Sequence, residues 1–451
     1  MSKIKVFLPL LLLLIVLIWA VPSILRAMPD RYVMRLPEPL QKLGLPENEV
    51  ALLPTVARPA GVQNLLLAES SAAESVEQEP ATPTLKSLAN APAQEESVAT
   101  PEGVTAVSEP VVAPPTPTPL PTATALPLPA ASRLHGFQHR FQTWNNCGPA
   151  TLAMALTYFD PNVTQDDTAA VLKPNPEDRN VSPEEMVAYV NQETPHRALF
   201  RVDGNRELLR RFVANGLPVV VEIGIDPPGE YRWLGWYGHY LLIVAYDDQQ
   251  EQFWVYDSWF GTSEEPLTNA HPDGRVLSYA DLETYWPHFN RNYILLYEPQ
   301  QQALVESIIG EEMDDNIMWQ NALQNVQQET IAEPDNAFYW FNLGTIYNAL
   351  ENTGKAATAF DQARSIGLPW RMLWYQFGPY ETYYRAGRYE DVVLLADVTL
   401  KDRPYFEESY YYKGLALAAL GDKAGAQENF EKAASFNPNF LPALSALQTL
   451  Q

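Results

Sequence analysis

Cysteine is almost absent from this sequence, whose 451 residues include only Cys147. A single thiol excludes a disulfide within the chain and any zinc site built from several thiolates. Histidine is also scarce, with six residues. His135 and His139 have the four-residue spacing of a ligand pair on a helix. Their segment RLHGFQHRFQ contains a glycine and alternating aromatic residues, however, which favour a strand. We therefore expect no metal and no cofactor.

Basic side chains are in short supply. The chain has 30 Lys and Arg against 55 Asp and Glu, which gives a formal net charge of −25. Proteins that bind nucleic acids need a basic surface to neutralise phosphates, and this composition offers none. We exclude nucleic acid as a partner. The length is sufficient for two or three domains.

Charge is missing altogether from the run Val6–Leu25. Twenty helical residues at about 1.5 Å each cover the roughly 30 Å of a bilayer core. Lys3 and Lys5 precede the run and favour a cytoplasmic N-terminus. We predict a transmembrane signal anchor over residues 1–29, a single-pass membrane protein and folded domains outside the cytoplasm. A cleaved signal peptide, which would leave the protein secreted, is the alternative.

The following residues, 30–131, are rich in Pro, Ala, Thr, Ser and Glu. Between Arg58 and Arg133 the only basic residue is Lys86, and the run APPTPTPLPTATALPLPA ends the stretch. Such a segment buries too little apolar surface to offset the entropy of ordering it. We predict a disordered linker that carries the folded domains away from the membrane.

Residues 132–300 combine helical patterns with aromatic and β-branched runs. The runs LPVVVEIGI, GHYLLIVAYDD, QFWVYDSWF and RNYILLYEP are typical of strands. The helical patterns come first and most of the strands later, which predicts an α+β domain rather than a βαβ repeat.

Residues 301–451 have a repeating, wholly helical pattern. One unit reads AFYWFNLGTIYNALENTGKAATAFDQARSIGLP and another SYYYKGLALAALGDKAGAQENFEKAASFNP. The spacing of their aromatic, alanine and glycine residues resembles tetratricopeptide repeats. Gly344 and Gly414 would let the two helices of a unit approach closely. The resemblance implies an all-α solenoid that binds a protein partner or the substrate.

Cys147 is followed by Gly148 and Pro149, and then by an apolar helical stripe that begins at Leu152. The thiol therefore stands at a helix N-terminus, where the backbone dipole favours thiolate. A small buried hydrophobic residue is the commoner role of a free cysteine. An exposed thiol outside the cytoplasm would be open to oxidation unless it were used, which favours a nucleophile.

A nucleophilic cysteine needs a base. His239 begins an apolar strand and Asp257 ends the next one, across the polar turn DDQQEQ. A hairpin would bring the carboxylate beside the imidazole, so that it orients the ring while the ring accepts the thiol proton. Gln142, five residues before Cys147, would donate toward an oxyanion. Each residue alone has an ordinary structural explanation, and it is their joint spacing that indicates catalysis.

The motifs Q-x4-C-G-P-A, G-H-Y and Y-D-S-W-F-G together resemble the C39-like peptidases of the papain-like superfamily, over about residues 136–298. The resemblance implies Cys147 as nucleophile, His239 as general base, Asp257 as orienting group and Gln142 as oxyanion donor. It implies an α+β papain-like cysteine peptidase that acts on a peptide or protein substrate.

Two alternatives stay open from the sequence. In the first, the fold serves as a non-enzymatic binding scaffold. In the second, the same residues perform acyl transfer or amide hydrolysis, because the acyl-enzyme step is shared. The aromatic run YRWLGWYGHY ahead of His239 includes Trp233, Trp236 and Tyr237. These rings would either line a peptide cleft or pack within the hairpin.

Overall fold

The computed structural model describes residues 21–25, 36, 40, 43, 52–60, 62–66, 128–225, 235–262 and 273–450. Residues 1–20 of the predicted membrane anchor and most of the predicted linker lie outside these ranges. Within them, no helix is both long enough and apolar enough to cross a membrane.

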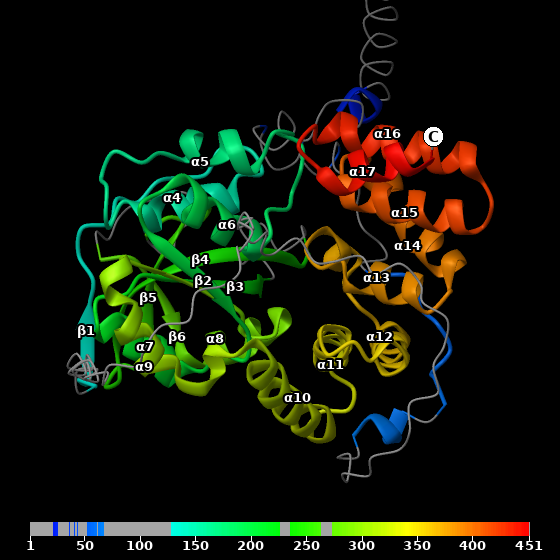
Figure 1. Ribbon diagram of the computed structural model, residues 1–451. Coiled ribbons are helices and arrows are strands. Elements are labelled where there is room, and N and C mark those ends of the chain that lie inside the picture. The colour runs from blue at the N-terminus through cyan, green and yellow to red at the C-terminus, as the bar shows by residue number, and fades with distance from the viewer. Residues whose placement is uncertain are drawn as a thin grey trace, which may run out of the picture. The chain divides into compact units, whose positions relative to one another are not determined.

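An antiparallel sheet forms the centre of the first folded region (Figure 1). Its strands lie in the order β2-β7-β3-β4-β5-β6, and β1 pairs with β4. The central strands are continuous apolar runs because helices cover both of their faces. The strands are β1 (Ala131–Arg133), β2 (Arg197–Arg201), β3 (Val219–Ile225), β4 (Tyr237–Asp247), β5 (Gln252–Asp257), β6 (Arg275–Ser278) and β7 (Tyr293–Tyr297).

Two groups of helices cover the sheet (Figure 1). Helices α4 (Cys147–Leu156), α5 (Gln165–Leu172) and α6 (Pro183–Glu193) share one apolar core with inward residues of the strands. Helices α7 (Arg206–Ala214), α8 (Tyr279–Tyr285) and α9 (Gln302–Ile309) share a second apolar core with other residues of the strands. The region is thus a mixed α/β fold with an antiparallel sheet, as its pattern of runs predicts.

The core of this region extends past the predicted limit at residue 300. Helix α9 follows the last strand, and its Val305 and Ile309 are buried among side chains of the sheet and α7. The two residues are four apart, so they occupy one face of the helix. A buried apolar stripe on a short helix is as compatible with a repeat as with a helix that covers a sheet, and the sequence pattern does not distinguish them.

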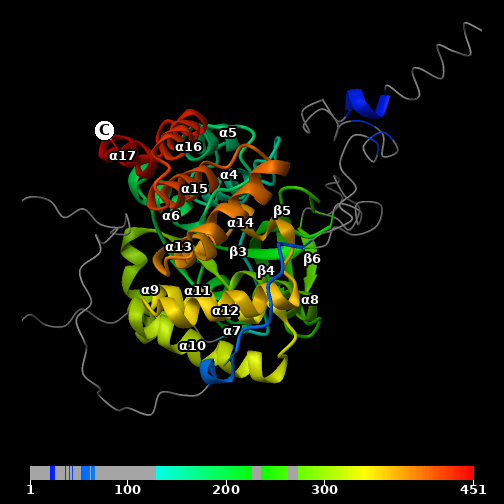
Figure 2. The same ribbon diagram turned by 90° about the vertical axis from the view of Figure 1, so that its right-hand side faces the viewer.

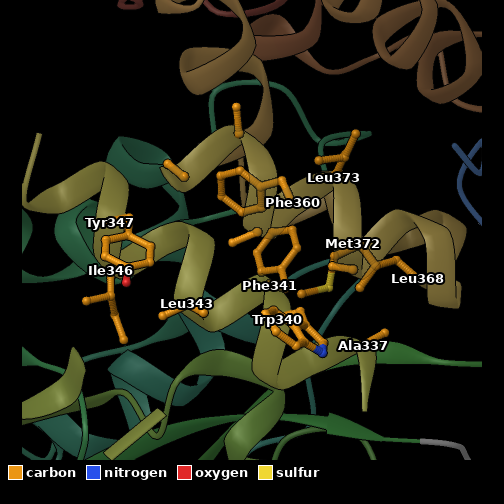
Figure 3. Close-up of a cluster of buried hydrophobic side chains, with 14 of the residues drawn as sticks. Ala337, Trp340, Phe341, Leu343, Ile346, Tyr347, Phe360, Leu368, Met372 and Leu373 are labelled. Carbon is orange, nitrogen blue, oxygen red and sulfur yellow. The ribbon is translucent and has the colours of Figure 1, made fainter. Parts of the chain in front are cut away.

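The C-terminal region consists of helices that stack in sequence order (Figure 2). Its helix pairs approach closely where glycine permits. An added Cβ at Gly344 would lie 2.7 Å from the Phe360 ring, and one at Gly414 would lie 2.6 Å from the Phe430 ring. Phe360 lies in the apolar cluster of Figure 3. The helices are α10 (Asp315–Ala332), α11 (Ala337–Ala349), α12 (Thr353–Ile366), α13 (Gly378–Arg385), α14 (Tyr389–Asp402), α15 (Glu407–Ala419), α16 (Lys423–Phe436) and α17 (Leu441–Leu450).

One part of the predicted disordered linker is ordered against these helices, which corrects the expectation for residues 52–60. The backbone N–H of Leu53 donates to the carbonyl oxygen of Leu368 at 2.8 Å, and the Leu53 side chain is buried. Further along, the Tyr347 hydroxyl donates to the carbonyl oxygen of Leu65 at 2.7 Å. Leucines of this segment, such as Leu53 and Leu65, bury apolar surface once a helical face is available to receive them.

The two helical glycines provide a test of this packing. Gly344→Ala and Gly414→Ala should each lower the free energy of unfolding by about 1–3 kcal/mol, because the new methyl group meets a buried ring. Gly354, also helical, has no atom within 4 Å of an added Cβ. Gly354→Ala should therefore be neutral or stabilising by up to about 1 kcal/mol. Denaturant titration of the three variants measures the difference, and equal effects would contradict the close approach.

Candidate active site

A network of hydrogen bonds fixes the loop ahead of the nucleophile. The Gln165 side-chain oxygen accepts from the backbone N–H of Thr143 and from the Asn146 carboxamide, both at 2.9 Å. Its nitrogen donates to the carbonyl oxygen of Phe141 at 2.8 Å. Gln165 belongs to no motif, so sequence reasoning did not find it. It holds the loop that ends at Cys147.

Cys147 is the first residue of α4 and is half-buried, with a free thiol. Its Sγ lies 3.1 Å from Nδ1 of His239. The backbone N–H of Tyr240 also donates to Sγ, at 3.2 Å. The sulfur therefore has polar contacts with an imidazole and a backbone N–H, and is not packed only against apolar neighbours.

His239 and Asp257 meet across the hairpin of β4 and β5, as the spacing predicts. Asp257 pairs with Leu241 in the sheet register. Nε2 of His239 lies 2.8 Å from Oδ1 of Asp257, and both side chains are buried. Contact through Nε2 leaves Nδ1 directed to the sulfur, so the carboxylate fixes the orientation of the ring.

Three further donors hold the Asp257 carboxylate. Oδ1 accepts from the backbone N–H groups of Trp259 at 2.8 Å and Phe260 at 2.9 Å. Oδ2 accepts from Nη1 of Arg275 on β6 at 3.3 Å. The sequence gives no sign of Arg275, because it lies on another strand with no fixed spacing to the motif. Its charge lies beside a carboxylate that has no access to water.

These contacts set the charge states of the pair. Burial alone would lower the pKa of His239, but the charges of Cys147 and Asp257 and the hydrogen bonds to both outweigh it and raise the pKa to about 10. Burial alone would raise the pKa of Asp257, yet the charge and hydrogen bond of His239, with Arg275, lower it to about 2. Both shifts favour an imidazolium paired with a carboxylate.

Gln142 is hydrogen-bonded to Ser258, the residue that follows Asp257. Its backbone N–H donates to the carbonyl oxygen of Ser258 at 2.8 Å, and the Ser258 hydroxyl donates to Oε1 of Gln142 at 2.8 Å. Because Oε1 is the acceptor in this bond, the orientation of the carboxamide is fixed. The amide nitrogen is then the end of the side chain that is able to donate to another group.

The two histidines of RLHGFQHRFQ lie in different environments. Nε2 of His139 lies 2.8 Å from the carbonyl oxygen of Asp257, and His135 is exposed. The predicted strand in this segment is wrong: β1 ends at Arg133, and residues 134–143 are irregular. In this segment, hydrogen bonds to Asp257 and Ser258 take the place of the regular backbone hydrogen bonds of a strand.

The aromatic run ahead of His239 is divided between two environments, and its Trp233 lies outside the described residues. Trp236 is buried and stacks on Phe289, with ring centroids 5.8 Å apart and planes at 11°. Tyr237 is half-buried, and its ring lies 6.1 Å from that of Trp259. Packing within the fold thus explains Trp236, whereas Tyr237 borders the catalytic residues.

The structure thus places Cys147, His239 and Asp257 in one line of contacts, at the start of α4 and on the β4–β5 hairpin. Residues 134–291 match the family described as "Peptidase_C39 like family", and residues 407–440 match "Tetratricopeptide repeat". The chain therefore carries a C39-like peptidase domain followed by a helical region with a tetratricopeptide repeat, which confirms both resemblances.

Two solved structures are similar to parts of the chain. A putative C39-like peptidase from Bacillus anthracis has 17% identity and a TM-score of 0.29, with 37% of this chain and 98% of that chain covered. The protein MamA has 16% identity and a TM-score of 0.28, with 32% and 82% covered. No curated protein matches this sequence.

The depressed pKa of Asp257 predicts a pH dependence of stability. A carboxyl group with a pKa of about 2 when folded and 3.8 as its ordinary value contributes about 2 kcal/mol of stability above its unfolded pKa. That contribution is lost as the pH falls toward 2. The unfolding free energies of wild type and Asp257→Asn should therefore differ most at pH 5–6 and converge below pH 3. Asp335→Asn, at an exposed turn, is the control; a constant gap for Asp257→Asn would contradict the ion pair.

Proposed function

We propose that this chain is a cysteine peptidase that hydrolyses peptide bonds with Cys147 as nucleophile, His239 as acid and base, Asp257 as orienting group and Gln142 as oxyanion donor. The observation that carries the proposal is the continuous line of contacts from Sγ through the imidazole to the buried carboxylate, at 3.1 Å and 2.8 Å. Such a line is what an activated thiol needs.

In the first half of the reaction, the Cys147 thiolate attacks the carbonyl carbon of the scissile bond. The carbonyl oxygen becomes an oxyanion, which accepts hydrogen bonds from the Gln142 amide and the Cys147 backbone N–H. The imidazolium of His239 then gives its Nδ1 proton to the leaving amine as the C–N bond breaks. A thioester and neutral imidazole remain.

In the second half, neutral His239 removes a proton from water, and the resulting hydroxide attacks the thioester carbon. Collapse of the second tetrahedral intermediate breaks the C–S bond and releases the carboxylic acid. The products are the thiolate and the imidazolium, so the starting charges are restored. Asp257 keeps its charge throughout and orients the ring.

Alkylation of Cys147 tests the ion pair without a known substrate. Because the chain has one cysteine, iodoacetamide reports on this thiol alone. Alkylation should stay fast at pH 6, where an ordinary thiol with a pKa of about 8.5 is almost fully protonated. His239→Ala should move the pH profile toward that of an ordinary thiol. Slow labelling of the wild type and no response to His239→Ala would support the non-enzymatic scaffold.

Turnover distinguishes the remaining residues once a peptide library has yielded a substrate. Gln142→Ala should leave alkylation unchanged and lower turnover about a hundredfold, because only the oxyanion needs that donor. Asp257→Ala should lower turnover more than alkylation, since it releases the ring without removing it.

Wild-type turnover should fall above pH 10, where the imidazolium with a pKa of about 10 loses the proton that the leaving amine needs. Cleavage of small amides but of no peptide would support the amidase alternative.

We also propose that an N-terminal helix tethers the peptidase to a membrane and that the repeat region recruits a protein partner or the substrate. The uncharged run Val6–Leu25 behind Lys3 and Lys5 supports the tether. The tetratricopeptide repeat at 407–440 supports the recruitment, because such repeats are common protein-binding modules. Protease added to intact cells should degrade the folded domains. Their full protection would contradict an external location.

A further inference from the structure

Aromatic rings and guanidinium groups alternate in a continuous row beside the catalytic residues. The Arg179 guanidinium lies 5.1 Å from the ring centroid of Trp144 and 5.2 Å from that of Trp374. The Arg371 guanidinium lies 5.2 Å from the Trp374 ring and 3.9 Å from the Tyr237 ring. Each distance is within the range of a cation–π interaction.

The two ends of this row adjoin the two halves of the proposed catalytic pair. Trp144 is three residues before Cys147, and Tyr237 is two residues before His239. The middle of the row comes from the helical region, where Trp374 ends a short 3-10 helix, Trp370–Trp374. The row therefore joins the nucleophile loop to the base strand through residues that belong to neither.

Glycine at position 238 lets the helical region reach the base strand itself. Gly238 precedes His239 and pairs with Gly224 in the sheet. An added Cβ at Gly238 would lie 2.6 Å from the Phe289 ring and 3.1 Å from that of Tyr375. Both rings thus lie close to the backbone where β4 begins.

A hydrogen bond fixes the same part of the strand. Nη1 of Arg371 donates to the carbonyl oxygen of Trp236 at 3.1 Å. Trp259 lies next to both Tyr237 and His239. Its ring centroid is 6.1 Å from that of Tyr237 and 6.2 Å from that of His239. A change at Arg371 consequently reaches His239 through its neighbouring residues, without any direct contact.

We propose that Arg371, Trp374 and Tyr375 of the helical region are positioning residues of the catalytic centre, which hold the Cys147 loop and the His239 strand in mutual register. This inference rests on the proposed function. The helical region then has a second role besides binding a partner, because the peptidase site is complete only when the helices are docked.

The physical reason is that the contact between the sulfur and the imidazole tolerates only a small displacement of either group. Cys147 and His239 lie on separate elements, α4 and β4, and a displacement of about 1 Å between reacting groups can cost on the order of a hundredfold in rate. Arginine suits the row because its planar guanidinium stacks on rings and also donates a directed hydrogen bond. Lysine keeps the charge but has no planar group that stacks on a ring and donates in a fixed direction at the same time.

The test compares two arginines of the helical region in the full chain. Arg371→Lys removes the stacking on Tyr237 and Trp374. Arg364→Lys is the matched control, because Arg364 is also buried and lies over a ring, that of Tyr383, at 5.4 Å, and pairs with Asp391. Iodoacetamide alkylation of Cys147 between pH 5 and 9 gives the thiolate profile, and thermal unfolding gives the stability of each variant.

Arg371→Lys should lower the alkylation rate at pH 6 about tenfold, the equivalent of a shift by one pH unit. Arg364→Lys should leave the profile unchanged even though it lowers the unfolding temperature. Trp374→Phe, which shortens the row but keeps a ring, should give a smaller shift in the same direction and serves if Arg371→Lys fails to fold.

Unchanged profiles in both Arg371→Lys and Trp374→Phe, with fast alkylation of the wild type, would overturn the inference and leave the proposed function intact. Slow alkylation of the wild type at pH 6 would instead contradict the proposed function, and the inference with it. Equal shifts in Arg371→Lys and Arg364→Lys would also overturn the inference, because they would indicate a general loss of packing.

Discussion

The burial of the Asp257 carboxylate is the constraint on which the site depends. Its side chain is fully buried, and transfer of an unpartnered carboxylate from water costs several kcal/mol. The fold offsets this cost with a dense set of donors, which are two backbone N–H groups, Arg275 and the His239 ring. The turn after β5 and the position of β6 follow from the need to supply them.

The same burial favours the charged form of His239. A carboxylate that cannot reach water stabilises the imidazolium next to it. Loss of the His239 charge would leave the Asp257 carboxylate with only Arg275 and the backbone donors as partners. The three side chains are therefore a single electrostatic unit, and single substitutions should not be read as additive contributions.

Local patterns in the sequence were sufficient for the parts of the site that depend on local structure. Cys147 starts a helix because Gly148 and Pro149 follow it, and His239 and Asp257 meet because a hairpin joins them. Arg275 and Gln165 were not predictable, because their places depend on how β6 and α5 pack. The contacts from Trp374 and Tyr375 lie still further from any motif, since they come from more than a hundred residues away.

Repeat helices usually depend on their neighbours in the stack alone, but here the buried cluster of the helices also contains Trp236 and Phe289 of the peptidase domain. The glycine of the G-H-Y motif gives the physical reason. Any side chain at position 238 would push away the Phe289 and Tyr375 rings, in the same way that one at Gly344 would push away Phe360. The absence of a Cβ at one position thus allows strand β4, Phe289 and the turn at Tyr375, which follows the 3-10 helix Trp370–Trp374, to meet beside His239. The boundary between the C39-like domain and the helical region is therefore a packed interface beside the candidate site, and the motif glycine is as much a part of that interface as of strand β4.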